Sequence, residues 1–597
     1  MNVLLVLIIS AVFFYFAIRW YGRLTAKWMG ENPNRTTPAV ELSDGKDYVP
    51  TKQSIIFAHH FTTIAGAGPI VGPTVAILFG YGPVWLWVLI GAIMIGAVHD
   101  FTSLFISLRE RGKSIAEITR NTLGTTGFFL FLCFAVMLLM LVAAAFMSMT
   151  VQALTSTVPL DFLGLQSGQT VLNTVVKDGV THGIIGGIAS TSVIIITLLA
   201  PILGYLIYKR GLNLGLAYVL AAVIAFGSVL IGLVSPITLD PKNWMLVLSV
   251  YVIFASALPV WMLLQPRDFT NVQILYLGIL AMIVTIIIGG FQGMTMQAPV
   301  MAIDAGQVKL GAIWPFLFIT VACGAVSGFH SLVSTGTTAK QVSKEGHARN
   351  VGYNGMILEG LLAVGTLIIV GAALSQPQYL QIVWPAPGAG TSNPILAFSL
   401  SMATMLNTTL GIPVYIGCIF GILLMEGFVV TTLDSAIRLN RYLLEELWNV
   451  LFKGNAPAFM RHPWFNSALG VLMMLWLAWN NAFTAIWPLF GSCNQLLAAL
   501  TLLAVSSWLL KRRRQAWFTI IPACFMVITT IAALFTLLLR FITQLRSGAA
   551  LSGPLTLVIM DMLCLALAIG VVFMACRNFQ RVREGKGIVA ESSPKAA

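Results

Sequence analysis

The feature that most constrains this chain is a cluster of prolines and glycines inside a segment that is otherwise apolar enough to cross a membrane. The segment is 59–73, HHFTTIAGAGPIVGP, with two prolines and three glycines. Proline removes a backbone donor and glycine lowers helix propensity, so a helix is expected to break here. In lipid, a broken helix persists only where protein or a water-filled cavity satisfies the freed backbone groups. The segment therefore predicts a binding site at the midplane of a membrane-spanning bundle, as in many carriers.

The composition of the whole chain agrees with a membrane location. Of its 597 residues, 58% are hydrophobic and only 9% are charged, and the mean hydropathy is +0.89. The net charge of +13 comes from basic residues in short loops between spans, so no nucleic-acid partner is expected. The seven cysteines lie within apolar runs without metal-type spacing, which predicts buried reduced thiols. No metal and no cofactor are predicted.

Apolar runs of about 20 residues recur along the chain and predict an all-α polytopic membrane protein of about 15 transmembrane helices. The segment 393–408 is too short to cross a bilayer and is expected to be re-entrant or interfacial. No soluble domain is expected, because the longest loops, 23–52 and 434–464, have about 30 residues. The expected spans are 3–22, 54–79, 83–107, 128–156, 186–207, 214–234, 243–264, 272–291, 311–333, 353–374, 411–433, 465–482, 484–510, 516–539 and 554–576.

The distribution of basic residues predicts how the chain is oriented in the membrane. If the loop after 3–22 is cytoplasmic, alternate loops hold 29 Lys and Arg residues and the opposite side holds 5. Positive charge is retained on the cytoplasmic side of membrane proteins. We therefore expect the N-terminus outside and the C-terminus in the cytoplasm. The tail over 577–597 is expected to be basic and disordered. Membrane lipid is the expected partner around the spans.

Ionisable side chains inside spans are costly, which makes them functional candidates. Counted inward from the cytoplasmic ends, most of them lie roughly 8–11 Å deep and would form one polar layer. Two interpretations stay open: a proton relay or cation site that lines an inner vestibule, or side chains that reach the interface or pair to brace the bundle. His59 and His60 rank first, because they directly precede the break and histidine titrates near physiological pH. The members of the layer are His59, His60, Asp100, His330, Glu359 and Glu426.

Hydroxyl groups gather in the segment 323–338, CGAVSGFHSLVSTGTT. Ser327, Ser331 and Ser334 recur at i, i+4 and i+7, so they and His330 are expected to share part of a helix face. Hydroxyl and carbonyl oxygens suit Na⁺, whereas histidine favours a proton. A cation site would therefore use Ser327 and Ser331 with carbonyls around Ala65–Gly68. The alternative is helix packing mediated by serine and glycine.

A second interruption is expected at Ser256–Trp261, where Pro259 would free a backbone carbonyl in midspan. Trp261 could wall a pocket, although tryptophan in a span more often packs or lies at the interface. The substrate is expected between the two interruptions, where freed amides and the positive end of a half-helix favour a carboxylate. The expected substrate-binding residues are Gly66, Ala67, Gly68, Pro69, Gly72, Ser256, Pro259 and Trp261.

The order of these interruptions predicts an internal repeat. With 1–53 as a leading helix and loop, 54–234 forms one block of five spans and 243–433 a second, each opening with an interrupted helix. The first block is odd-numbered, so the second begins from the opposite side of the membrane. This arrangement predicts a LeuT-like core of five-plus-five inverted repeats, with extra helices at both ends, including 465–576. The hydroxyl-rich span 311–333 would face the broken first helix.

Several segments resemble the carbon starvation A (CstA) family of peptide and pyruvate transporters, in order and over most of the chain. The resemblance implies a bacterial inner-membrane carrier that imports small peptides or pyruvate, and a LeuT-like core. It departs at His99, where a glutamine often stands in the family. The matching segments are HHFTTIAGAGPIVGP at 59–73, AVHDF at 97–101, LLQPRDF at 263–269, CGAVSGFHSLVSTGTT at 323–338, TTLDSAIRLNRYLLEE at 431–446 and WPLFGSCNQLLAAL at 487–500.

We therefore expect a secondary transporter, not an enzyme, that imports small peptides and/or pyruvate with protons by alternating access. A Na⁺-coupled carboxylate symporter, a channel and a membrane sensor of carbon status remain alternatives. A sensor would normally carry a soluble output domain. No P-loop, HExxH or G-x-S-x-G motif is present, so the sequence offers no ATP site or enzyme site of these types.

Overall fold

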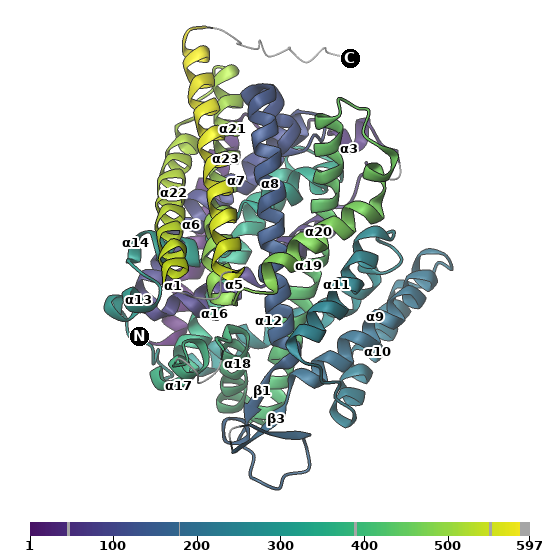
Figure 1. Ribbon diagram of the computed structural model, residues 1–597, viewed down its shortest axis with the longest axis vertical. Coiled ribbons are helices and arrows are strands. Elements are labelled where there is room, and N and C mark those ends of the chain that lie inside the picture. The colour runs from purple at the N-terminus through teal and green to yellow at the C-terminus, as the bar shows by residue number, and fades with distance from the viewer. Residues whose placement is uncertain (45–47, 178, 387–390, 548–551, 586–597) are drawn as a thin grey trace.

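The computed structural model describes residues 1–44, 48–177, 179–386, 391–547 and 552–585, and most of them are helical (Figure 1). Within these ranges, 11 helices are long and apolar enough to cross a membrane, or 12 if one bent pair counts as a single span. The chain is thus a multi-pass membrane protein. The expected count of 15 spans is not confirmed, because four of the expected spans, 54–79, 243–264, 311–333 and 465–482, are shorter or broken.

The long helices account for most of the described residues. A π-helical turn at 17–21 joins α1 to α2, and another at 92–96 joins α6 to α7. The long helices and the pieces that extend them are α1 (Val3–Phe16), α2 (Gly22–Met29), α6 (Tyr81–Gly91), α7 (Ala97–Arg109), α8 (Ile115–Thr155), α9 (Gly186–Tyr208), α10 (Leu214–Val234), α12 (Leu264–Phe291), α16 (Asn354–Ala373), α19 (Val414–Leu451), α21 (Phe483–Lys511), α22 (Trp517–Arg546) and α23 (Ser552–Arg583).

Shorter elements connect or cover them. Strands β1 (Thr157–Pro159), β2 (Thr174–Lys177) and β3 (Val180–Ile184) form an antiparallel sheet in the order β1-β3-β2, at one end of the molecule in Figure 1. The shorter helices are α3 (Pro38–Glu41), α4 (Gln53–Ile64), α5 (Gly68–Ala76), α11 (Pro241–Ala257), α13 (Ile303–Lys309), α14 (Ile313–Thr320), α15 (Phe329–Gly336), α17 (Gln376–Val383), α18 (Pro394–Leu410) and α20 (Pro463–Ala478).

The predicted break in the segment 59–73 is present. Helix α4 ends at Ile64 and α5 begins at Gly68, and the two are bent by 43°. Pro69 occupies the first turn of α5, where a missing N–H leaves no helical bond unmade. A second break, not expected from the sequence, divides 313–336 into α14 and α15 with residues 321–328 between them.

The two breaks lie against each other. A Cβ atom added at Gly68 would overlap the side chain of Cys323, and one added at Gly72 would lie 3.1 Å from the carbonyl oxygen of Thr320. Glycine therefore lets α5 cross the second break at backbone distance. Helix α21 satisfies carbonyls that the break frees: Gln495 Nε2 donates to the carbonyls of Phe318 (2.8 Å) and Val321 (3.2 Å). A backbone interruption at membrane depth thereby keeps its hydrogen bonds.

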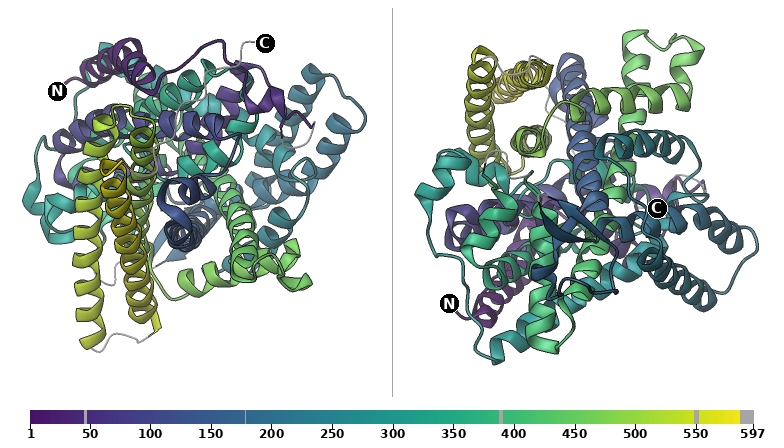
Figure 2. Two further views of the ribbon diagram at one scale, coloured as in Figure 1. Left: turned by 90° about the horizontal axis from the view of Figure 1, so that it is seen from above. Right: turned by 60° about the horizontal axis from the view of Figure 1, so that its bottom comes forward.

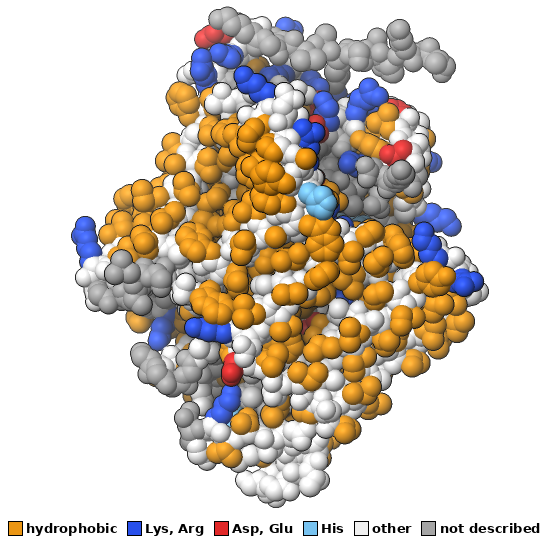
Figure 3. All heavy atoms as spheres, turned by 45° about the vertical axis from the view of Figure 1, so that its right-hand side comes forward, with side chains coloured by type: hydrophobic (Ala, Val, Ile, Leu, Met, Phe, Trp, Pro, Cys, Tyr) orange, Lys and Arg blue, Asp and Glu red, His pale blue; other side chains and the backbone are white. Residues whose placement is uncertain are grey.

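Three long helices surround this crossing. Helices α8 and α19 pack against each other, and α21 packs against α8 (Figures 1 and 2). Of these, α21 is the most enclosed, since 94% of its most apolar stretch is buried. In contrast, α10, α22 and α23 lie at the periphery and expose apolar side chains. On the face of the molecule that Figure 3 shows, apolar side chains form a broad band. That band matches a surface in contact with lipid.

Three expectations about boundaries need correction. Pro259 lies in the turn between α11 and α12, not inside one helix, because α11 ends at Ala257 and α12 begins at Leu264. The expected span 411–433 continues to Leu451 as α19, because buried partners stabilise the polar residues after position 433. The expected tail begins as helix, since α23 extends to Arg583; residues 586–597 lie outside the described residues.

The crossing of the breaks makes a prediction about stability. Gly68→Ala places a methyl group on Cys323 and should lower the free energy of unfolding by about 1–3 kcal/mol, the usual cost of overpacking. Adding Cys323→Gly removes the overlapping atoms and should restore part of that loss. Thermal unfolding in detergent measures both effects.

The matched control is Gly227→Ala in α10, because no atom lies within 4 Å of the added carbon and alanine favours helix. It should not lower the unfolding temperature. Equal unfolding temperatures for Gly68→Ala and Gly227→Ala would contradict the close crossing.

Candidate functional site

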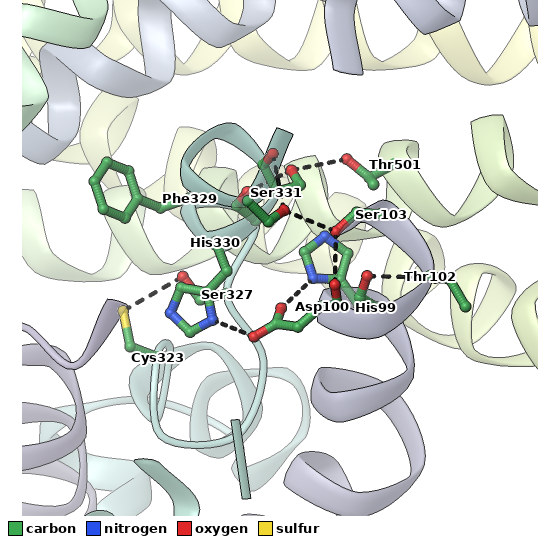
Figure 4. Close-up of polar contacts among 12 residues, drawn as sticks. His99, Asp100, Thr102, Ser103, Cys323, Ser327, Phe329, His330, Ser331 and Thr501 are labelled. Atoms are coloured by element: carbon green, nitrogen blue, oxygen red, sulfur yellow. Dashed lines mark hydrogen bonds and ion pairs between the residues drawn. The ribbon is translucent and has the colours of Figure 1, made fainter. Parts of the chain in front are cut away.

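A buried histidine between two carboxylates forms the centre of the candidate site, and Figure 4 shows its contact with one of them, Asp100. His330, in the first turn of α15, has its Nδ1 atom 2.7 Å from Asp100 Oδ2. Its Nε2 atom lies 3.3 Å from Glu359 Oε2 on α16. All three side chains are fully buried. One imidazole therefore connects α7, α15 and α16 and lies next to the second break.

The protonation states of this group are limited by hydrogen-bonding chemistry. An ionised carboxylate only accepts hydrogen bonds, so two of them beside one ring require a proton on each ring nitrogen. The two oxygens of Glu359 have no hydrogen-bond partner among the described residues. A buried carboxylate of this kind is stable only when a nearby charge compensates it or when it binds a proton. Counted from a neutral imidazole and an ionised carboxylate, the His330–Glu359 pair can therefore bind one extra proton or two. The first makes His330 a cation, and the second neutralises Glu359.

Asp100 is held in place from two sides. His99 Nδ1 lies 2.7 Å from Asp100 Oδ1, and His99 is itself fully buried. In the next turn of α7, the Ser103 hydroxyl lies 3.1 Å from that of Ser334 on α15. These contacts fix α7 against α15, so Asp100 can turn little relative to His330.

The other predicted members of the polar layer lie around this centre or apart from it. His60 is fully buried, with Nδ1 3.0 Å from the Thr338 hydroxyl, and its ring lies beside Gly355, one turn before Glu359. His59, the preceding residue, is exposed. Glu426 is buried on α19, two turns before Asp434, and belongs to a different polar group. The predicted layer thus divides into three parts: the centre around His330, the neighbouring pair His59 and His60 on α4, and Glu426 in a separate group on α19.

The predicted cation residues already have partners. Ser327 accepts from Asn494 Nδ2 (3.1 Å), and the Ser331 hydroxyl donates to the Gly328 carbonyl (2.7 Å). The expectation that Ser327 shares a helix face with Ser331 and Ser334 is wrong, because Ser327 precedes α15 and lies in the break. Gly324 and Gly328 explain the interruption, since both approach neighbouring helices closely.

Asn494 was not recognised from the sequence and organises the start of α15. Its Oδ1 atom accepts from the N–H of Phe329 (2.9 Å), and its backbone carbonyl accepts from the N–H of Gly328 (3.0 Å). The amide thereby caps α15 from another helix and places His330 one residue into it. A polar pair, Asn494-Gln495, inside an apolar run was the available signal.

The predicted substrate residues fall into two places. Gly66, Ala67, Gly68, Pro69 and Gly72 are buried at the first break, as is Ala65, which was expected at the cation site, and Gly66 lies against Thr432 of α19. Ser256 lies in the last turn of α11, and Pro259 and Trp261 lie in the α11–α12 connection. There, Arg438 donates to the carbonyls of Ala255 and Leu258, and Lys209 lies 5.0 Å from the Trp261 ring. The two sets thus belong to different parts of the bundle.

A second buried polar group joins α11, α12 and α19. The fully buried Arg267 donates to Tyr251 and Asp434 and lies 3.0 Å from Asp268 Oδ1. Tyr251 in turn donates to Asp434 (2.8 Å). Asp434 was not predicted from the sequence, because hydropathy placed the end of the expected span 411–433 one residue before it. This network braces the α11–α12 connection against α19.

Within the described ranges, no three His, Cys, Asp or Glu side chains are grouped so that they could hold a metal ion.

Comparison with known proteins identifies relatives over most of the chain. A family model described as "Carbon starvation protein CstA" matches residues 2–393 and 388–533. The peptide transporter CstA of Bacillus subtilis is 32% identical, covering 89% of this chain and 89% of the relative. That of Escherichia coli is 31% identical over 89% and 80%. The pyruvate/proton symporter BtsT of Escherichia coli is 30% identical over 89% and 81%. These relatives are named as transporters, not as enzymes.

Solved structures resemble the chain only distantly. A manganese transporter of Eremococcus coleocola aligns with 91% of this chain and 99% of its own, at 12% identity and a TM-score of 0.33. A score this low supports no argument about fold or function.

The ion pairs of His330 predict a strong coupling in stability. His330→Gln leaves two buried carboxylates without their charged partner and should cost about 3–5 kcal/mol in the free energy of unfolding. Asp100→Asn in the same chain removes one of those charges, so the double variant should be clearly more stable than the sum of the single effects predicts. Unfolding of the four proteins in detergent measures this cycle. Additive losses would contradict the pairing.

Proposed function

Because the chain belongs to the carbon starvation CstA family, we propose that it imports pyruvate and/or small peptides across the bacterial inner membrane together with protons. The observation that supports coupling of transport to protons is the buried His330 ring between Asp100 and Glu359. In a membrane, such groups are expensive and are retained for ion or proton pathways. The relatives' names supply the substrate candidates.

The charges of the centre favour a proton as the coupling ion. With His330 protonated and both carboxylates ionised, the group of three carries one net negative charge. One further proton, taken up by Glu359, neutralises it. Burying a neutral centre in protein costs less free energy than burying a charged one, so proton binding favours a closed conformation. His59 and His60 would carry the proton from the centre to the exposed face of α4, which the orientation proposed below places on the cytoplasmic side.

Sodium coupling is the second candidate for the driving ion. A site formed by Ser327, Ser331 and the carbonyls around Ala65–Gly68 would be composed of oxygen ligands only. Both hydroxyls already have hydrogen-bond partners, on α21 or at Gly328 just before α15, and a sodium ion would have to replace these bonds. The proton is therefore the better supported ion. A channel and a membrane sensor of carbon status remain the alternatives from other classes.

Alternating access would use the two crossed breaks. Half-helices joined by short unwound segments can tilt separately, whereas α8 and α19 form a long, well-packed support. A LeuT-like pair of inverted repeats would place one broken helix in each repeat. The pair α4–α5 and the pair α14–α15 suit that role better than Pro259, which lies between two helices.

We also propose that the N-terminus faces outward and the C-terminus faces the cytoplasm. The support is the excess of basic residues on one set of loops, 29 against 5. The sheet β1-β3-β2 would then lie outside, and the exposed His59 would face the cytoplasmic side.

Uptake into proteoliposomes tests the function directly. Labelled pyruvate and labelled di- and tripeptides are offered under an imposed proton gradient, a sodium gradient, or neither. We expect accumulation of at least one substrate with the proton gradient and not with the sodium gradient. Uptake that ignores both gradients would contradict symport.

Glu359→Gln tests the proton site. The variant cannot take up the extra proton, so gradient-driven accumulation should fall to the level seen without a gradient, while exchange of labelled for unlabelled substrate continues. The matched control is Asp561→Asn, a buried carboxylate on the peripheral helix α23. It should keep accumulation. Full accumulation by Glu359→Gln would exclude Glu359 as the coupling group.

A further inference from the structure

We infer that a small cavity between the two breaks is a subsite for a methyl-sized apolar group of the substrate, and that Phe146 and Phe490 set its size limit. This inference rests on the proposed function and specifies it. It assigns a selective role to residues of α8 and α21 that the sequence reading did not single out.

The cavity lies where the two breaks face the supporting helices. Gly66 and Ile64 contribute from the first break, and Cys323 and Phe329 from the second. Each of α8, α19 and α21 adds its own side chains. The complete lining is Ile64, Gly66, Val142, Phe146, Cys323, Phe329, Thr432 and Phe490. A group bound here would contact both moving breaks and all three supporting helices at once.

The lining is apolar and the space is small. Only the Thr432 hydroxyl is strongly polar among the lining side chains, and it donates to the Phe428 carbonyl (2.9 Å). The space open to the centre of a water molecule is about 10 Å³, which is room for roughly one water. A charged or strongly polar group would lose hydration here without gaining partners. The cavity therefore suits the apolar end of a substrate, such as the methyl group of pyruvate or of an alanine residue.

Two phenylalanine rings of the lining, Phe146 and Phe490, pack against each other, and Phe490 packs against a third aromatic ring. The rings of Phe146 and Phe490 meet edge to face with centroids 6.2 Å apart, and Trp487 lies 5.1 Å behind Phe490. The Trp487 indole donates to the Thr320 carbonyl, which ties the wall to the second break. Rings fixed in this way cannot move aside easily for a larger group, so they should discriminate by size.

Size selection predicts a graded response to substrate length. In wild-type proteoliposomes, initial uptake per unit concentration should fall by about tenfold or more from pyruvate to 2-oxobutyrate, and again to 2-oxoisovalerate, as expected for an added carbon in an apolar pocket. If peptides are the transported class, the same order should hold for Ala-Ala over Val-Val.

Phe490→Leu enlarges the cavity and should lower the preference for pyruvate over 2-oxobutyrate by about tenfold. The matched control is Phe134→Leu, equally buried on α8 but outside the cavity lining, which should keep the wild-type preference. If Phe490→Leu does not fold, Val142→Ala enlarges the same cavity with a smaller loss of packing. An unchanged preference in a folded variant of the lining would overturn the inference.

Separate measurements test transport of these substrates and binding of their apolar end in the cavity. Wild-type protein that takes up none of these substrates under a gradient contradicts the proposed function. Thermal stabilisation of the detergent-solubilised protein by the same series of acids then decides the subsite alone. Stabilisation that falls with size in wild type but not in Phe490→Leu supports it, and equal stabilisation by all acids, or none, overturns it.

Discussion

The rest of the structure depends on one interaction, the contact of His330 with two buried carboxylates from different helices. Asp100 and Glu359 would each be unstable at this depth as isolated charges. His330 compensates both, and its own position depends on the start of α15, which Asn494 caps from α21. A proton at this centre therefore affects the packing of α7, α15 and α16 together.

The second requirement is that two broken helices cross at backbone distance. Gly68 and Gly72 permit the approach, and Gln495 and Trp487 satisfy the carbonyls that the second break frees. Because α21 contributes both these bonds and the cap of α15, it stabilises the unwound segments from one side. Helix α19 faces them from another side through Thr432. The proton centre, the breaks and the apolar cavity thus share the same neighbours, which gives a physical basis for coupling proton binding to a change in the site.

Local chemistry explains what the sequence could predict. The break at 65–67 follows from Pro69 and its neighbouring glycines, and the cost of ionisable groups in lipid marks Asp100, His330 and Glu359 as special. Their pairing could not be predicted, because it depends on how three helices pack. Asp434 was missed for a related reason: hydropathy ended the expected span 411–433 just before this residue, whereas the buried Arg267 pairs with Asp434 and lets α19 continue. The break at 321–328 was hidden because Ser327, Ser331 and Ser334 also fit a regular helix.

We propose that substrate enters the cell together with a proton that binds at the centre around His330. The most direct measurement is the pH inside proteoliposomes that hold a pH-sensitive dye, while an inward gradient of the transported substrate is the sole driving force. We predict that the lumen acidifies as substrate enters, and that the acidification disappears in Glu359→Gln although exchange continues. Substrate entry at an unchanged internal pH in the wild-type protein would contradict it.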